Sequence, residues 1–592
     1  MCRFRGICTR LMDLWLYLQV ELHGHYSIER MCLLQRYNLS TSLSRVCLAT
    51  ALAPFPCLLI LTLIDVAPLA PTEDGSNANY MFWMRDFVTI ALMTRAIVEQ
   101  LHLSIPSLEI TPGRVLGMSL ISSAGAVAFM VVMARVIGFP LPFALVVGIP
   151  IWFAVLVVSF GCFFGAKLKR EAALRQELLN YIVVIACQVV LTFIYPAYLY
   201  GFRSVDATAQ TFYVLLLPVV KIATKNWISF FLGKKDDLKP QIVILNIEVF
   251  NALYVASSMQ NSSSISTTMT LTLIDFVLAW VSINDVSHLL VDITAFLEKI
   301  PASHLLKSKD FMEIALQILE EDPELSYATS LRFFSCKTPR PATVRSSKVE
   351  NVNSSAVGSA KRSRNFTWHR QIFPLAPVLP DSPSTTQVAV DNLLKTATSS
   401  SISDTKPSTF KSLDHVFSTK ERLVYVQRTA QVLFTTEFII LIEYTEVIIP
   451  FIYSMYTLAM FQLPNRVYYP QIRELDELAL ARTLGNVAIY GMMELLSFIA
   501  MSLLLKRKIG ISTLHQLAFV LDREWRMVQS NLFLWICYTI QNSLDHNGGL
   551  AAEEASRTSV VMLSDSALCS LCLVGADFSW RFRWLRSQHP SG

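Results

Sequence analysis

The feature that most constrains this chain is a series of apolar runs, each about 18 to 25 residues long. A bilayer core roughly 30 Å thick needs about 20 residues of helix to cross it. Apolar residues make up 53% of the chain and charged residues only 16%, which lies outside the range of soluble proteins. The pattern predicts an all-α fold, a polytopic transmembrane helical bundle.

Ten runs are expected to span the membrane, eight before a long polar segment and two after it. They are 46–66, 80–103, 115–137, 141–164, 181–202, 210–232, 241–259, 267–283, 432–459 and 484–505. The second run carries Arg85, Asp86, Arg95 and Glu99, and a charge near a helix centre costs about 3 kcal/mol. Arg95 and Glu99 are four residues apart, so we expect them to pair and lower this cost.

Basic residues near the ends of the runs indicate the orientation. Arg30, Arg36 and Arg45 precede the first run. The charged residues of the loop after it, Glu73 and Asp74, are both acidic, so we expect a cytoplasmic N-terminus. With ten spans, the basic stretches 167–175, 234–239, 361–364 and 506–508 also fall in the cytoplasm. Omitting the second run would move all four of them outside, which supports its assignment.

The predicted organisation has six parts. They are a cytoplasmic N-terminal segment (1–43), an eight-helix transmembrane region (44–284), an amphipathic cytoplasmic segment (285–337), a disordered Ser/Thr/Pro-rich linker (338–419), a two-helix transmembrane region (420–508), and an amphipathic helix with an irregular C-terminal tail (509–592). The linker has few large apolar residues and cannot bury enough surface to offset its ordering entropy. In the segment 285–337, Phe311, Ile314, Ala315 and Ile318 form one helical stripe.

Ionisable residues stand close to the centres of successive spans. The candidate set is Lys221, Lys225, Glu248, Asp275, Glu443, Glu446 and Glu494. Charges at that depth must face protein or water, and they commonly mark a pathway for ions or protons. A second interpretation is equally physical, because the two lysines could pair with two of the acids simply to hold the bundle together. The sequence leaves both interpretations open.

Other chemistry is missing from the chain. The net charge of +5 is too small to indicate nucleic-acid binding. The stretch 233–235 (Gly-Lys-Lys) lacks the leading glycine and the Ser or Thr of a phosphate-binding loop. No catalytic, metal or cofactor motif is present. We therefore predict no enzyme activity. Asn261 begins the only Asn-X-Ser sequon expected to face outward, so it is the candidate glycosylation site.

Five stretches carry a resemblance to known proteins. They read PVVKIATKNWISFFLG (218–233), IEVFNALYVASSMQ (247–260), LIDFVLAWVSINDV (273–286), IEYTEVIIPFIYSMY (442–456) and HQLAFVLDREWRMVQSNLFLWICYTIQNSL (515–544). With them, the chain resembles a family of uncharacterised multi-pass membrane proteins abundant in plant-pathogenic oomycetes of the Phytophthora type. The resemblance implies a membrane location and brings no activity. The chain departs from the family at 549–574, which looks like an insertion.

Three functions remain open at this level. The first is a secondary transporter or channel-like protein in the lipid bilayer, moving an ion or small molecule along the midplane charges. The second is a non-transporting receptor or scaffold that recruits cytoplasmic partners through 338–419. A membrane enzyme is the third, although the spans contain no ExxH metal-ligand spacing.

Overall fold

The structure is a computed structural model that describes residues 17–141, 144–204, 213, 216–261, 265–301, 304–322, 325, 416–473, 475–510 and 512–547. The chain divides into two units, 1–327 with 420–592, and 328–419, and the first unit holds the bundle. The predicted linker therefore lies almost wholly outside the described residues, as do the sequon residues Ser262 and Ser263 and the segment 549–574.

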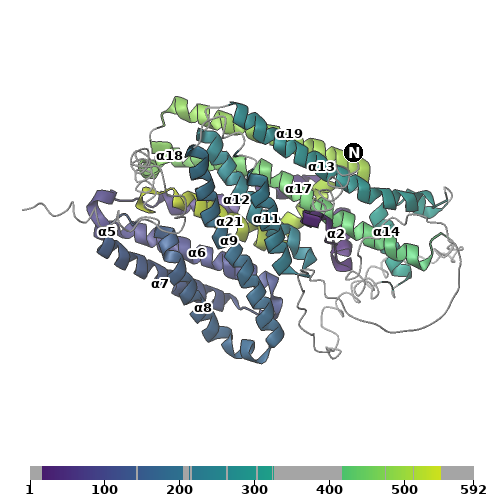
Figure 1. The fold of residues 1–592 in the computed structure, drawn as a ribbon, viewed down its shortest axis with the longest axis horizontal. Helices are drawn as coiled ribbons and strands as arrows, with labels where there is room; N and C mark the ends of the chain where they lie inside the picture. The colour runs from purple at the N-terminus through teal and green to yellow at the C-terminus, as the bar shows by residue number, and fades with distance from the viewer. Residues whose placement is uncertain are drawn as a thin grey trace, which may run out of the picture. The chain divides into compact units, whose positions relative to one another are not determined.

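Every regular element among the described residues is a helix (Figure 1). The α-helices are α2 Ile28–Ser40, α3 Leu43–Leu52, α4 Phe55–Val66, α5 Gly75–Ala78, α6 Tyr80–Ser104, α7 Pro112–Ile137, α8 Ala144–Arg170, α9 Ala172–Ser204, α11 Leu216–Leu232, α12 Lys239–Asn261, α13 Ile265–Glu298, α14 Phe311–Glu321, α17 Thr419–Phe461, α18 Pro470–Arg473, α19 Glu477–Ile509, α20 Thr513–Arg523 and α21 Trp525–Asn542. Short 3-10 turns include η1 Val20–Leu22, η4 Asp236–Leu238, η7 Pro464–Tyr468 and η8 Asp545–Asn547. The all-α prediction is confirmed for this part of the chain.

Among the described residues, six helical stretches are long and apolar enough to cross a membrane. They are Leu43–Val66, Pro112–Ile137, Val147–Arg170, Ala172–Ile194, Val277–Glu298 and Glu477–Lys508. Their apolar side chains point outward, since Leu63, Val136 and Leu496 are 63%, 72% and 62% exposed. An apolar exterior of this kind suits lipid and is costly in water, so the fold is compatible with an integral membrane protein.

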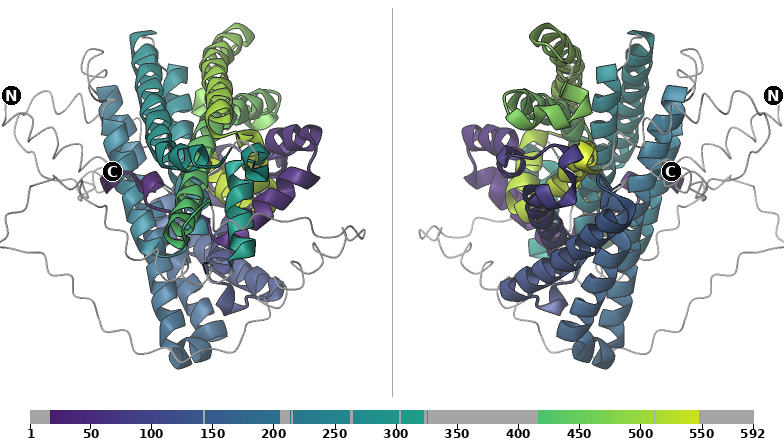
Figure 2. Two further views of the ribbon diagram at one scale, coloured as in Figure 1. Left: turned by 90° about the vertical axis from the view of Figure 1, so that its right-hand side faces the viewer. Right: turned by 90° about the vertical axis from the view of Figure 1, so that its left-hand side faces the viewer.

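Three other helices form the interior. Each residue from 241 to 250 of α12 is at most 1% exposed, and most of 425–449 in α17 is buried. α21 packs against both α6 and α12, and Figure 2 shows the yellow C-terminal helices lying among the others. Polar side chains on these helices are surrounded by protein, which lowers the cost of placing them at membrane depth.

Several helix boundaries follow from local chemistry. Pro54 lacks a backbone N–H, so the first predicted span is split into α3 and α4 at this point. Asp476 caps α19 by accepting a hydrogen bond from the backbone N–H of Ala479 at 2.6 Å, and Gly510 ends the same helix with φ +80°. The predicted stripe of α14 is buried, as its periodicity indicates.

Two predictions about helices differ from the structure. The eighth span was expected to end at residue 283, but α13 continues to Glu298 because its apolar face persists past Asp285. Arg95 and Glu99 do not form the expected pair. Arg95 is exposed, and Glu99 forms an ion pair with Arg526 of α21, a helix more than 400 residues later in the chain.

α21 runs alongside the first span. Gln529 donates a hydrogen bond to the carbonyl of Ala53, Gln541 donates to the carboxylate of Asp65 at 3.1 Å, and His546 binds the carbonyl of Ala70 at 2.9 Å. Residue numbers therefore increase together along both segments, so α21 and the chain from α3 to the loop after α4 are parallel. Asp522, just before α21, reaches Arg45 at 2.9 Å.

Candidate functional site

Five of the seven predicted midplane residues meet at one cavity. Lys221 and Lys225 of α11, Glu248 of α12, and Glu443 and Glu446 of α17 line a cavity of about 80 Å³. Ser282 and its neighbours on α13 close a further side. α11 and α12 lie about 200 residues before α17 in the chain, and the five predicted residues bring three carboxylates and two ammonium groups to the cavity.

Glu248 is the centre of this charge cluster. Its two carboxylate oxygens form ion pairs with Lys221 Nζ at 2.7 Å and with Lys225 Nζ at 2.8 Å. Lys221 also lies 3.8 Å from Glu446. The Glu248 side chain is fully buried and the lysines are only 10% and 12% exposed, so little water screens these pairs. Both sequence interpretations predict contacts of this kind.

Glu443, which lines the cavity, also accepts a hydrogen bond from Ser497 of α19 at 3.0 Å. The other two predicted midplane residues are Glu494 and Asp275. Glu494 is also on α19 and is 4% exposed, but it does not line the cavity. Asp275 belongs to α13, one turn before the cavity wall, and its side chain lies outside the described part, as does that of Asn261.

The N-terminal segment 17–26 also reaches the cavity, which sequence reasoning missed. Leu18, Gln19 and Glu21 complete the wall. The segment is held by its backbone: Asn226 donates to the carbonyl of Leu18 at 2.8 Å, and Thr435 donates to that of Glu21 at 2.8 Å. A chain segment of mixed polarity carries no periodic signal, so its insertion between helices could not be read from the sequence.

A second buried cluster lies around Glu437, close to this segment. Its carboxylate accepts from Arg30 at 2.8 Å, from Gln241 at 2.9 Å and from the hydroxyl of Tyr26. Gln516 donates to the Tyr26 hydroxyl at 2.8 Å. Glu437 is 0% exposed, and each carboxylate oxygen has donors, which is the requirement for a buried charge. The cluster joins α2, α12, α17 and α20 and is structural in character.

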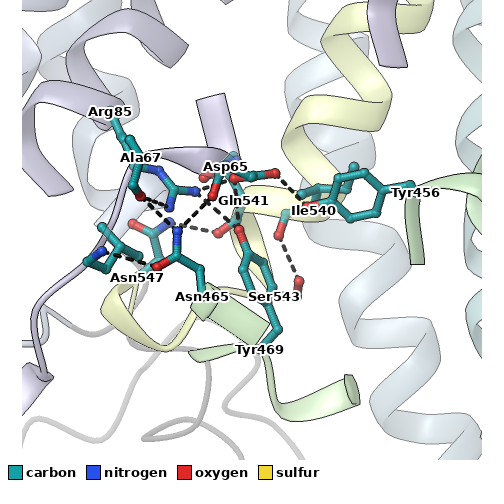
Figure 3. A network of polar contacts seen from close by, with 11 residues as sticks. Asp65, Ala67, Arg85, Tyr456, Asn465, Tyr469, Ile540, Gln541, Ser543 and Asn547 are labelled. Atoms are coloured by element: carbon teal, nitrogen blue, oxygen red, sulfur yellow. Dashed lines mark hydrogen bonds and ion pairs between the residues drawn. The ribbon is translucent and has the colours of Figure 1, made fainter. Parts of the chain in front are cut away.

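A third cluster is built around Asp65, at the end of the first span (Figure 3). Arg85 forms an ion pair with this carboxylate, Tyr456 donates to it at 2.5 Å, and Tyr469 donates at 3.0 Å. Gln541 supplies a fourth donor at 3.1 Å. Asp65 is therefore fully buried with its charge satisfied by groups from four segments, and no local pattern along the chain predicts that these segments meet.

His546 packs beside this third cluster in η8. Its Nε2 faces two acceptors, the carbonyl of Ala70 at 2.9 Å and the side-chain oxygen of Asn79 at 3.1 Å, so Nε2 carries the proton. Nδ1 is buried with no hydrogen-bond partner among the described residues. Burial therefore lowers the pKa of His546 to about 4, because a second proton would be left without an acceptor.

This lowered pKa predicts a pH dependence of stability. The unfolded chain takes up a proton on His546 near pH 6.5 and the folded chain only near pH 4, so stability should fall across this interval by up to about 3 kcal/mol. In thermal unfolding at pH 7 and pH 4, the variant His546→Gln should lose this part of the decline. Burial raises the pKa of Asp545 to about 6, which acts in the opposite direction, so Asp545→Asn should make the decline in stability steeper. An identical pH profile for the parent and His546→Gln would contradict the assignment.

No three His, Cys, Asp or Glu side chains of the described residues come together in a way that could hold a metal ion. In comparisons with known proteins, no family model, curated protein or solved structure matches this chain. The functional argument therefore rests on the geometry of the cavity and the clusters.

Proposed function

We propose that this protein is a secondary transporter whose binding site is the charged cavity between α11, α12, α13 and α17. The observation that carries the proposal is the convergence of Lys221, Lys225, Glu248, Glu443 and Glu446 on one space. Ion pairs that only hold helices together need no space between them. Here the charged groups face a cavity large enough for several waters or an ion, since one water needs about 10–15 Å³ by the same measure.

The charge balance favours a cation or proton as the transported or coupling ion. Three carboxylates face two ammonium groups, and Glu21 adds a fourth carboxylate to the wall. A site with an excess of carboxylates attracts positive charge, and a carboxylate in such a site can exchange its proton or its lysine partner for an incoming cation. At about 80 Å³ the cavity suits a small ion better than a large organic molecule.

The proposed topology keeps ten spans with a cytoplasmic N-terminus. Six of the spans are supported by apolar, outward-facing helices. The others coincide with α6, α11, α12 and α17, which are more polar because protein surrounds much of their surface. In support of this arrangement, the basic loop 234–239 lies beside the start of α9 and beside the N-terminal segment, since Lys235 contacts Glu177 at 3.1 Å and His25 contacts Asp236 at 3.2 Å.

The direct test is ion flux. Purified full-length protein is reconstituted in liposomes that contain a pH-sensitive dye, and a sodium or potassium gradient is imposed. We expect a pH change or tracer-cation uptake that protein-free liposomes lack. Absence of both signals under either gradient would overturn the proposal in favour of a receptor or scaffold, in which the same ion pairs are structural.

The N-terminal segment 17–26 is expected to restrict access to the cavity. A Cβ atom on Gly24 would overlap the ring of Phe434, so this position needs glycine. Gly24→Ala should displace the segment and break the hydrogen bonds that the carbonyls of Leu18 and Glu21 accept, each worth about 1 kcal/mol. A cysteine introduced at Ile222 should then react with a membrane-impermeant maleimide about tenfold faster.

Gly161→Ala is the matched control for that experiment, because a Cβ on Gly161 meets nothing within 4 Å. Equal labelling rates in the Gly24→Ala and Gly161→Ala backgrounds would show that the segment does not limit access to the cavity.

A further inference from the structure

A second cavity, separate from the charged one, lies between α6, α7, α8, α9 and α21. Its volume is about 100 Å³, and its wall is almost entirely apolar, including Ile97, Leu145, Ile185 and Leu534. Gln188 of α9 also lines it and is 3% exposed. An apolar cavity with a single amide in its wall is typical of a site for a small, mostly apolar ligand.

The orientation of the Gln188 amide is fixed by its neighbours. The indole N–H of Trp535 can only donate, and it lies 3.0 Å from Asn246 Oδ1, while Asn246 Nδ2 donates to the carbonyl of Ile242 at 2.6 Å. Gln188 therefore has to turn its NH₂ group toward Asn246 Oδ1, at 2.6 Å. The same NH₂ group also donates to Gln100 Oε1 at 3.2 Å.

This network leaves one hydrogen-bond acceptor unused. Gln188 Oε1 is buried and has no partner among the described residues. Other polar groups of the wall are satisfied: Thr192 donates to the carbonyl of Val189 at 2.6 Å, and Tyr538 donates to that of Thr192 at 3.2 Å. Leaving an amide oxygen unpaired in an apolar setting costs about 1–3 kcal/mol, so a partner for it is strongly favoured.

We propose that this cavity binds a small apolar molecule with one hydroxyl group, which enters from the membrane phase and donates its hydrogen bond to Gln188 Oε1. Water is a poor occupant, because a buried water needs two to four polar partners and the cavity offers one. An alkane would fill the space and leave the acceptor unpaired. A monohydric alcohol of about five to seven heavy atoms satisfies both the apolar wall and the single acceptor.

The test uses a photoreactive alcohol, hexanol carrying a diazirine, on detergent-purified full-length protein. Adducts mapped by mass spectrometry should fall on residues of the cavity wall, and cyclopentanol should compete at about tenfold lower concentration than methylcyclopentane, in which a methyl group replaces the hydroxyl. Competition by the two compounds at equal concentration would overturn the proposal, as would adducts found only outside the wall.

Two variants separate recognition from folding. Gln188→Leu should remove the preference for the alcohol, whereas Gln176→Leu, on the exposed face of the same helix, should keep it. Ala126→Ile adds volume to the cavity from α7 and leaves the Gln188 amide in place, so it should abolish labelling. Unchanged labelling in Ala126→Ile would contradict the site even if Gln188→Leu fails to fold. Ion flux through the charged cavity is a separate measurement, so failure of either proposal leaves the other standing.

Discussion

The substitution Asp65→Ala is expected to destabilise the bundle by about 4 kcal/mol. The substitution removes the carboxylate that pairs with Arg85 and accepts hydrogen bonds from Tyr456, Tyr469 and Gln541. The guanidinium of Arg85, whose side chain is 4% exposed, is then buried without a counter-charge. Breaking one side of a buried ion pair costs about 3–5 kcal/mol. Thermal unfolding in detergent should show a large drop in melting temperature and poor recovery of monodisperse protein.

A double-mutant cycle tests the physical cause. Arg85→Met should be similarly harmful, but the double variant Asp65→Ala/Arg85→Met should be less destabilised than the sum of the two single variants, because no uncompensated charge remains. Glu73→Ala, at an exposed position in the following loop, is the control and should change little. Strict additivity in the cycle would show that the Asp65 and Arg85 charges do not act as a pair.

The second large effect is expected at Glu248. Glu248→Gln removes the charge that Lys221 and Lys225 share, so two buried ammonium groups repel each other. Cation flux in liposomes should fall at least tenfold. This variant alone cannot distinguish a transport role from a structural one, because the same change is expected to cost about 3–5 kcal/mol of stability.

Removing the whole cluster makes the distinction. In the combined variant Lys221→Met/Lys225→Met/Glu248→Leu/Glu446→Gln no uncompensated charge remains among these four positions, and apolar replacement of a buried ion cluster is often neutral or stabilising. The variant should therefore fold as well as the parent and carry no flux. Flux at the parental rate in the folded variant would rule out the charged cavity as the pathway.

Much of the fold could be predicted because hydrophobic length is a local property. The runs 115–137 and 484–505 fall within α7 (Pro112–Ile137) and α19 (Glu477–Ile509), although α19 extends past its run at both ends. Even the marginal run 80–103 corresponds to a continuous helix, α6. The number of membrane crossings stays a prediction, since six helical stretches of the described residues qualify as spans by length and composition, against the ten expected.

Part of the candidate site could also be anticipated. An ionised group at membrane depth must be shielded, so Lys221, Glu248 and Glu446 were expected to face protein or water. The structure shows which groups pair with these residues, and the sequence does not predict that pairing. Asp65 and Gln541 are 476 residues apart, and nothing in either local pattern indicates the other.

The pairing of Glu99 illustrates the same limit. Helical spacing favoured Arg95, four residues away, yet Arg526 lies closer in space and takes this role. Gln188 is a further case, because an isolated glutamine in an apolar run resembles an ordinary packing residue until Trp535 and Asn246 fix its orientation.

The parallel course of α21 and the first span has a consequence for the two ends of the bundle. Gln529 and Gln541 are twelve residues apart, as are their partners Ala53 and Asp65, so α21 travels the same depth as its neighbour and in the same direction. Because the proposed topology sends the first span outward from the cytoplasm, α21 would add one crossing to the ten predicted from hydrophobicity. Asn547 then emerges on the extracytoplasmic side, across the lipid from Arg30 and Arg45.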